Sequence, residues 1–160
     1  MQMNRLLKNV VNVSLCATIG LTALALGTAA PAHAATKTTR ELIKFGEKYL
    51  GTPYKLGVVS MSTNAFDCSS FTQYVFDKFN VSLARTSILQ ATEGTKVPKG
   101  YLSMGDLVFF NTNGRSISHV AIYAGNNKIL HSSNKGVNIA DMNSKYWKSK
   151  FVTARRVVKS

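Results

Sequence analysis

Two stretches in the first half of the chain have apolar residues at helical spacing. The first covers residues 41–50 and ends at Gly51, and its apolar face consists of Leu42, Phe45 and Tyr49. The second begins near Asp67, which is a good N-cap residue, and its apolar face consists of Phe71, Val75 and Phe79. A short third helix is expected over residues 87–93, before a loop over 94–100.

From residue 106 onward the pattern changes to short runs that are rich in β-branched and aromatic residues. The runs that predict strands are 106–110, 117–124, 128–131, 137–139 and 151–158, and a helical turn is expected around Trp147. Helices followed by strands indicate an α+β domain. We therefore predict an antiparallel sheet of about five to six strands with the N-terminal helices packed against it.

Two histidines in the strand region fall on one face of a predicted hairpin. If residues 125–127 form a three-residue loop, Ala121 faces His131 across the two strands. His119 then lies diagonal to His131 on the same face, about 7–8 Å away at the backbone. A two-residue loop would instead place the two histidines on opposite faces, because one step of register reverses every side chain.

The N-terminal segment has the three parts of a secretory signal peptide. A basic start is followed by an apolar run over residues 10–26 and by an A-x-A cleavage pattern that ends at Ala34. The competing interpretation is a membrane anchor, but the run is only marginally long enough to span a bilayer, and small residues interrupt it. We therefore expect a signal peptide over 1–34 and a single domain over 35–160, secreted or in the cell wall and not stably inserted in a membrane.

The composition favours a folded, basic domain. Hydrophobic residues make up 45% of the chain, which is too much for a disordered tail. The chain has 20 Lys and Arg against 7 Asp and Glu, a formal net charge of +13, and removal of the signal leaves it basic. Such a charge favours contact with polyanions. Because no motif for reading nucleic acid is present, we expect anionic cell-wall polymers and no nucleic acid, with an ordinary solvated surface as the alternative.

Removal of the signal leaves a single cysteine, Cys68, which cannot form an intramolecular disulfide. Next to the N-cap Asp67, Cys68 would lie in the first turn of a helix, where backbone N–H groups and the helix dipole favour a thiolate. A free cysteine is more commonly a small buried hydrophobe. The polar neighbours Asp67, Ser69 and Ser70 weaken that interpretation and indicate a candidate nucleophile.

His119 and His131 provide the base that such a nucleophile needs. His119 would take the proton of Cys68, and His131 would hydrogen-bond the other ring nitrogen of His119 and fix its tautomer. A lone strand histidine is more often a partly buried residue that bonds a carbonyl, but here both histidines share one predicted face. One Cys and two His could also bind zinc, but their spacing matches no known zinc pattern. We expect no metal and no other cofactor.

Six short segments follow one another along the chain in a specific order and spacing, and three of them contain Cys68, His119 and His131. The segments are Gly51-Thr-Pro-Tyr54, Phe66-Asp-Cys-Ser-Ser-Phe71, Arg85-Thr-Ser-Ile-Leu-Gln90, Gly105-Asp-Leu-Val-Phe-Phe110, Ser118-His-Val-Ala-Ile-Tyr123 and Ile129-Leu-His131-Ser132. Together they resemble the NlpC/P60 family of cell-wall cysteine peptidases, over about residues 41–158. The resemblance implies a papain-like α+β fold with a Cys–His–polar triad.

Position by position, the resemblance also assigns roles. The nucleophile, the base and the polar third member match Cys68, His119 and His131. Tyr54 matches a tyrosine whose hydroxyl lies near the nucleophile, and Asp67 and Ser69 match residues that help bind the free amine end of a stem peptide. A helix that flanks the cleft matches Arg85, Ser87 and Gln90. The chain departs from the family at Leu56-Gly57-Val58, where Trp-Gly-Gly is frequent, and this leaves the cleft shape open.

Members of this family typically hydrolyse the bond between γ-D-glutamate and a diamino acid in peptidoglycan stems. The resemblance therefore implies a secreted cysteine endopeptidase that acts on the peptidoglycan stem peptide, and we expect it to be a monomer. Two alternatives stay open at this point. One is a non-catalytic basic module that binds the cell wall, and the other is an amidase that acts on poly-γ-glutamate or another amide.

Overall fold

The computed structural model describes residues 35–158, so the predicted signal peptide lies outside the described residues. The helices are α1 (Lys37–Glu47), α2 (Cys68–Asp77), α3 (Ser87–Gln90) and α4 (Lys145–Lys150), with a 3-10 turn over Lys99–Tyr101. The strands are β1 (Thr95–Lys96), β2 (Leu107–Phe110), β3 (His119–Gly125), β4 (Lys128–Ser133), β5 (Gly136–Asp141) and β6 (Phe151–Arg156). Within residues 35–158, no helix is both long and apolar enough to cross a membrane.

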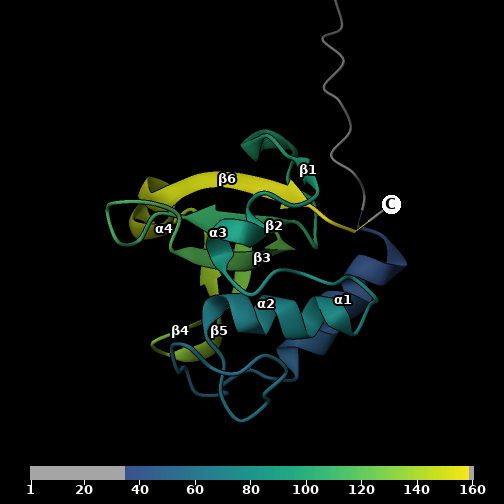
Figure 1. The fold of residues 1–160 in the computed structure, drawn as a ribbon. Helices are drawn as coiled ribbons and strands as arrows, with labels where there is room; N and C mark the ends of the chain where they lie inside the picture. Colours follow the sequence, from purple (N-terminus) through teal and green to yellow (C-terminus); the bar gives the residue numbers. More distant parts are fainter. Residues whose placement is uncertain (1–34, 159–160) are drawn as a thin grey trace, which may run out of the picture.

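The strands form one six-stranded sheet in the order β1-β6-β2-β3-β4-β5. Every pair of neighbouring strands is antiparallel. Figure 1 shows α1 and α2 together on one side of the sheet and α4 beside the start of β6. This arrangement confirms the predicted α+β class with helices against an antiparallel sheet. The sequence predicts a loop where the short strand β1 lies. Its strand character comes from pairing with Arg155 and Arg156 of β6, which no local pattern indicates.

The first helix begins earlier than its apolar pattern indicates. Thr36 is its N-cap, and the Thr36 side chain accepts a hydrogen bond of 3.1 Å from the backbone N–H of Thr39. The helix therefore starts at Lys37, ahead of the predicted 41–50 stretch, and it ends at Glu47. The third helix is also shorter than predicted, since it ends at Gln90.

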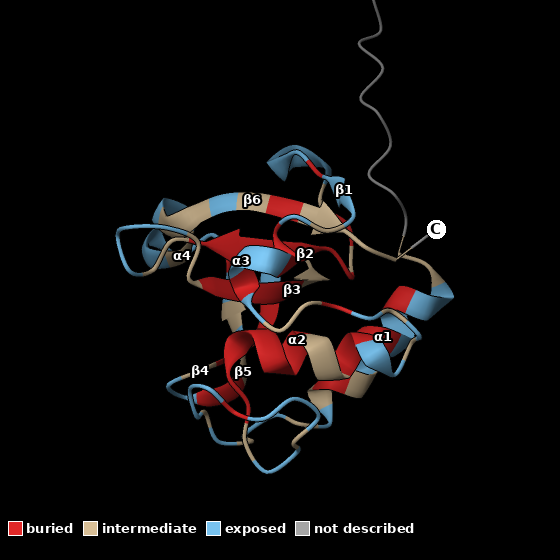
Figure 2. Ribbon diagram, in the orientation of Figure 1, coloured by how far each residue is buried: buried red, intermediate tan, exposed pale blue. Residues whose placement is uncertain are grey.

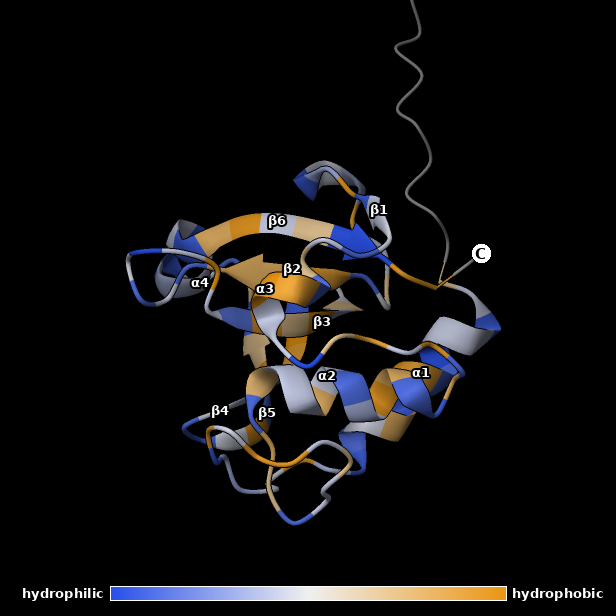
Figure 3. Cartoon of the chain, viewed as in Figure 1, coloured by the Kyte–Doolittle hydropathy of each residue, from blue (hydrophilic) through white to orange (hydrophobic). Residues whose placement is uncertain are grey.

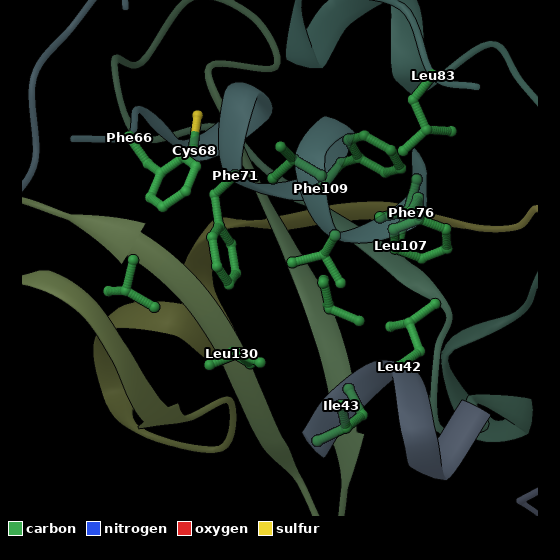
Figure 4. Packing of buried hydrophobic residues seen from close by; sticks show 14 of the residues in the cluster. Leu42, Ile43, Phe66, Cys68, Phe71, Phe76, Leu83, Leu107, Phe109 and Leu130 are labelled. Carbon is green, nitrogen blue, oxygen red and sulfur yellow. The ribbon is translucent and has the colours of Figure 1, made fainter. Parts of the chain in front are cut away.

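Apolar side chains cover both faces of the sheet. One cluster lies between the helices and the sheet and includes Leu42, Phe71, Phe109, Val120 and Leu130. Figure 4 shows part of this cluster, and Figure 2 shows that the buried residues concentrate in α2 and the central strands. A second cluster covers the opposite face and includes Val108, Phe110, Ala121, Ile129 and Ala154. Alternate residues of β2 and β3 thus belong to opposite clusters, as expected for strands that are buried on both sides.

Hydropathy differs between the central strand β2 and the end of β6. Figure 3 shows apolar residues along the whole of β2 and hydrophilic residues at the end of β6. All four residues of β2 are buried. The hydrophilic residues at the end of β6 are Arg155 and Arg156, which pair with the short edge strand β1.

The turn between β3 and β4 differs from its prediction, although the register does not. Gly125 pairs with Lys128, so the turn has two residues, Asn126 and Asn127, both with left-handed backbone (φ 49° and 58°). A register shift between Tyr123 and Gly125 then inserts one extra residue. This bulge compensates for the shorter turn, because Tyr123 pairs with Ile129 as in the predicted register. The expected three-residue loop was wrong, and the two histidines nevertheless stay on one face.

Candidate active site

Cys68 is the first residue of α2, and a capping box fixes this helix end. The Asp67 carboxylate accepts a hydrogen bond of 2.8 Å from the Ser70 N–H, and the Ser70 hydroxyl accepts one of 2.9 Å from the Asp67 N–H. The predicted N-cap role of Asp67 is therefore confirmed. Cys68 itself is only 7% exposed and lies beside Phe66 and Phe71 at the margin of the core (Figure 4).

Burial dominates the acidity of this thiol. Burial raises the pKa of Cys68 above its ordinary value, and the charge of Asp67 raises it further. Hydrogen bonds from the backbone N–H groups of Val120 and Ser69 act in the opposite direction without cancelling the effect of burial. The helix position alone favoured a lowered pKa, and that expectation fails because it left out desolvation. In the free protein, Cys68 is a neutral thiol that needs a base.

His119 and His131 form a buried pair at the start of β3 and in β4. Nε2 of His119 lies 2.8 Å from Nδ1 of His131, within hydrogen-bond distance, and the two residues are 8% and 1% exposed. Burial, followed by the neighbouring His131, lowers the pKa of His119 to about 3. Burial also lowers the pKa of His131 to about 4, while the nearby side chain of Asn138 acts in the opposite direction. Both rings are therefore neutral at pH 7, and the predicted contact between them is present.

The Val120 backbone N–H places the start of β3 at the sulfur of Cys68. Val120 directly follows His119 in β3, and its N–H is near enough to the Cys68 sulfur to act against the raised pKa of the thiol. In addition, α2 packs against both β3 and β4, the strands that carry the two histidines. The helix that begins with Cys68 thus packs against the two strands that carry His119 and His131.

An aromatic wall that the sequence analysis missed encloses the histidine pair. The ring of Trp147 in α4 lies 5.1 Å from that of His119 and 5.0 Å from that of His131, measured between centroids. Phe110 of β2 supports it from behind at 4.8 Å. The sequence pattern predicts only a helical turn around Trp147, and no local signal indicates its contacts, because they arise when α4 folds back over the sheet.

Two cavities meet at this site. The first, which we call the histidine cavity, has a volume of about 420 Å³, and the residues that line it include His119, His131, Trp147, Tyr54 and Lys135. The second, which we call the cysteine cavity, has a volume of about 440 Å³, and the residues that line it include Cys68, Asp67, Ser69, Arg85 and Leu56. Ser118 lines both cavities, so they adjoin next to His119.

Tyr54 connects the two cavities. It lines the histidine cavity, and its pKa is raised by burial and by the charges of Cys68 and Asp67, which belong to the cysteine cavity. Tyr54 is also joined to the chain that leads into α2 by a bridge to Phe66. The role of Tyr54 beside the nucleophile stays a prediction.

Asp67 has an ion-pair partner that the sequence did not reveal. Both terminal nitrogens of Arg85 donate to the two carboxylate oxygens, and the Gly57 N–H and the Ser69 hydroxyl donate at 3.0 Å and 3.2 Å. Burial alone would raise the pKa of Asp67, but the hydrogen bonds and charge of Arg85, together with backbone hydrogen bonds, hold it below its ordinary value. Asp67 is thus ionised, and Arg85 neutralises its charge.

Metal chemistry is not indicated by the residues that the structure describes. Across residues 35–158, no group of three or more His, Cys, Asp or Glu side chains is arranged to hold a metal ion. Nε2 of His119 and Nδ1 of His131 already face each other, so only one nitrogen of each ring is left for a ligand. The arrangement is suited instead to proton transfer between a thiol and an imidazole.

Comparison with known proteins assigns the chain to a family. Residues 51–156 match the family model described as NlpC/P60 family. The chain belongs to the NlpC/P60 family, and its structural neighbours are NlpC/P60 domains of papain-like architecture. The resemblance that the sequence motifs indicated is therefore confirmed.

Several similar proteins carry names that refer to the cell wall. The chain is 39% identical over 116 residues to a Bacillus subtilis protein named probable peptidoglycan endopeptidase LytE, covering 72% of this chain and 34% of that protein. It is 36% identical over 118 residues to the B. subtilis bifunctional muramidase/DL-endopeptidase CwlT, covering 72% of this chain and 36% of that protein. A crystal structure of an NlpC/P60 family protein from Bacillus cereus superposes with a TM-score of 0.70 at 33% identity, covering 76% of this chain and 40% of that one. The chain thus spans about a third of the curated relatives named here.

Proposed function

We propose that this chain is a cysteine endopeptidase that hydrolyses peptidoglycan stem peptides, at the bond between γ-D-glutamate and the diamino acid that follows it. One observation carries the proposal: α2, whose capped first residue is Cys68, packs against the strands β3 and β4 that carry the buried His119–His131 pair. The relatives support the substrate, since LytE is named for peptidoglycan and CwlT for DL-endopeptidase activity.

The first chemical step forms an acyl-enzyme. His119 takes the proton of Cys68 through Nδ1, because its Nε2 is turned to His131. The Cys68 sulfur attacks the carbonyl carbon of the γ-glutamyl amide, and the negative charge moves to the carbonyl oxygen, where the Cys68 backbone N–H stabilises it. The imidazolium of His119 then protonates the amine nitrogen, the C–N bond breaks, and the diamino acid leaves as an amine.

The second step releases the acyl group. His119, neutral again, removes a proton from a water molecule, which attacks the thioester carbonyl carbon. The C–S bond breaks, and the proton on His119 returns to the Cys68 sulfur. His131 acts throughout as a positioning residue, because Nδ1 of His131 accepts the Nε2–H of His119 and stabilises the imidazolium form.

The two cavities divide the substrate between them. The leaving amine must receive its proton from His119, so the diamino acid lies in the histidine cavity, and the γ-glutamyl side lies in the cysteine cavity. Tyr54 would lie beside the nucleophile, and Asp67 and Ser69 would help bind the free amine end. Because Arg85 neutralises Asp67, this amine would meet acceptor oxygens and no unpaired charge.

We also propose that the protein is exported and acts at the cell wall. Residues 1–34 would direct export and be removed, and residues 35–160 would act as a monomer outside the cytoplasm. The excess of basic residues would favour contact with anionic wall polymers, in line with the net charge of +13. High salt should then weaken binding to purified walls.

Cys68→Ala tests the proposal directly. The wild type should release fragments from defined muropeptides, and mass spectrometry should locate the cut after γ-D-glutamate. Cys68→Ala should release none, whereas Ser82→Ala, which removes an exposed hydroxyl outside both cavities, should act as the wild type does. Full activity of Cys68→Ala would overturn the proposal. Wall binding without cleavage would favour the binding module, and cleavage of poly-γ-glutamate alone would favour the other amidase.

A further inference from the structure

Lys135 is a cation in the wall of the histidine cavity. It lies in the turn between β4 and β5, four residues after His131, and its side chain is exposed. The cavity wall contains no Asp or Glu, and Lys135 is its one permanently charged member among the described residues. Its other polar members are neutral amides, hydroxyls and imidazoles, including Asn134, Asn138 and Ser133. The cavity is therefore suited to a negatively charged group.

The turn that carries Lys135 is held in place by backbone contacts. The Val137 N–H donates to the Thr52 carbonyl at 2.9 Å. Gly136 has φ +78°, and a Cβ there would approach the Thr52 oxygen to 2.6 Å, so only glycine permits this close approach. The Asn138 side chain donates to the Gly136 carbonyl at 2.8 Å from the far side of the turn. The backbone of Lys135 is thus fixed at the cavity rim, and only its flexible side chain must be ordered by a ligand.

The charge of Lys135 has no partner within the part of the chain that the structure describes. The four ion pairs there are Lys37–Glu41, Arg85–Asp67, Lys128–Asp141 and Arg156–Asp106. Arg85, the cation of the cysteine cavity, is already bound to Asp67. Of the two cations that line the cavities, Lys135 is therefore the one that can meet an anion of the substrate.

The chemistry of the cleavage decides which part of the substrate reaches Lys135. The residue that supplies the leaving amine enters the histidine cavity, because its nitrogen must receive the proton of His119. Resting on the proposed endopeptidase function, we propose that Lys135 determines specificity by binding a carboxylate on the side chain of the leaving diamino acid. The enzyme then distinguishes a diamino acid with a free side-chain carboxylate from one in which this group is an amide or is missing.

The test compares two γ-D-glutamyl peptides that differ only in the leaving residue, whose side chain ends in a carboxylate in one and a carboxamide in the other. The wild type should cleave the carboxylate peptide with a kcat/KM about two- to fivefold higher, as expected for a solvent-exposed ion pair. The preference should shrink in high salt. Lys135→Ala should abolish the preference, Lys135→Arg should keep it, and Lys135→Glu should reverse it. Lys44→Ala removes an exposed lysine of α1 outside both cavities and should leave the preference unchanged.

The outcomes separate this inference from the function on which it rests. Cleavage of both peptides by the wild type at equal kcat/KM would overturn the role of Lys135 and leave the endopeptidase function intact. A preference that survives in Lys135→Ala would overturn it as well, because another residue would then read the carboxylate. Cleavage of neither peptide would overturn both proposals. Circular dichroism of each variant checks that the fold is retained, which is expected because the side chain of Lys135 is exposed.

Discussion

The ring of His119 meets the ring of His131 edge to face, with Nε2 of the first 2.8 Å from Nδ1 of the second. Both rings are buried, and burial keeps both neutral. A hydrogen bond between two neutral imidazoles needs one donor and one acceptor, so the tautomer of one ring sets the tautomer of the other. In the proposed mechanism His119 becomes an imidazolium, and Nδ1 of His131 would then be the acceptor.

Replacement of His131 should slow catalysis more than it weakens binding. In His131→Ala the imidazolium of His119 loses its acceptor, and we expect kcat to fall about a hundredfold with little change in KM. His131→Asn keeps a side chain that can accept a hydrogen bond and should recover part of the rate. Steady-state kinetics on a defined muropeptide measures both values, and circular dichroism reports folding. An equal loss for Asn and Ala would contradict an orienting role.

Alkylation of Cys68 should follow the charge state of His119. Because burial raises the pKa of the thiol, its rate of reaction with iodoacetamide should rise with pH. A thiolate near pH 7 requires that ion pairing with Cys68 raise the pKa of His119 far above the value of about 3 that it has in the neutral pair. His119→Ala removes this acceptor and should shift the inflection of the rate profile to higher pH. Mass spectrometry can follow the reaction from pH 5 to 10. Identical profiles for both proteins would show that His119 does not ionise Cys68.

Trp147→Ala should hydrate the histidine pair. Loss of the indole exposes both rings to water, so desolvation falls and the pKa of His119, now lowered to about 3, should rise toward 6.5. The variant should also lose about 2–3 kcal/mol of stability, because the partly buried Trp147 packs against the second apolar cluster. NMR titration of the histidine rings measures the shift. Lys148→Ala is the matched control, since Lys148 is an exposed residue of the same helix and lines neither cavity.

Removal of Arg85 should destabilise the N-terminus of α2. In Arg85→Ala the buried Asp67 carboxylate keeps its charge without its partner, and we expect a loss of about 2 kcal/mol, reduced by the partial exposure of Arg85. The pKa of Asp67 should rise, so the stability that its ionisation contributes should be lost at a higher pH on acidification. Urea unfolding at pH 7 and pH 4 checks both points. Arg85→Ala combined with Asp67→Asn should recover much of the loss, and additive losses would contradict the pairing.

The sequence alone predicted much of the fold and the residues with chemistry. The helical face at Phe71 and Val75, the cap at Asp67 and the strands around residues 106–131 are short-range patterns, and each is present. Such patterns also predicted the hairpin register that places both histidines on one face, although the predicted length of the turn was wrong. A two-residue turn followed by a bulge has the same register as a three-residue loop, so alternation of side chains cannot separate the two.

Other features of the site depended on contacts between distant segments. The Arg85–Asp67 pair, the wall formed by Trp147 and the raised pKa of Cys68 all result from packing between elements far apart in the chain. Local sequence determined which side chains exist and on which face of a helix or strand they lie, because backbone geometry repeats every few residues. Only the tertiary structure decided how deeply each group is removed from water, and desolvation and partner charges set the protonation states on which the chemistry depends.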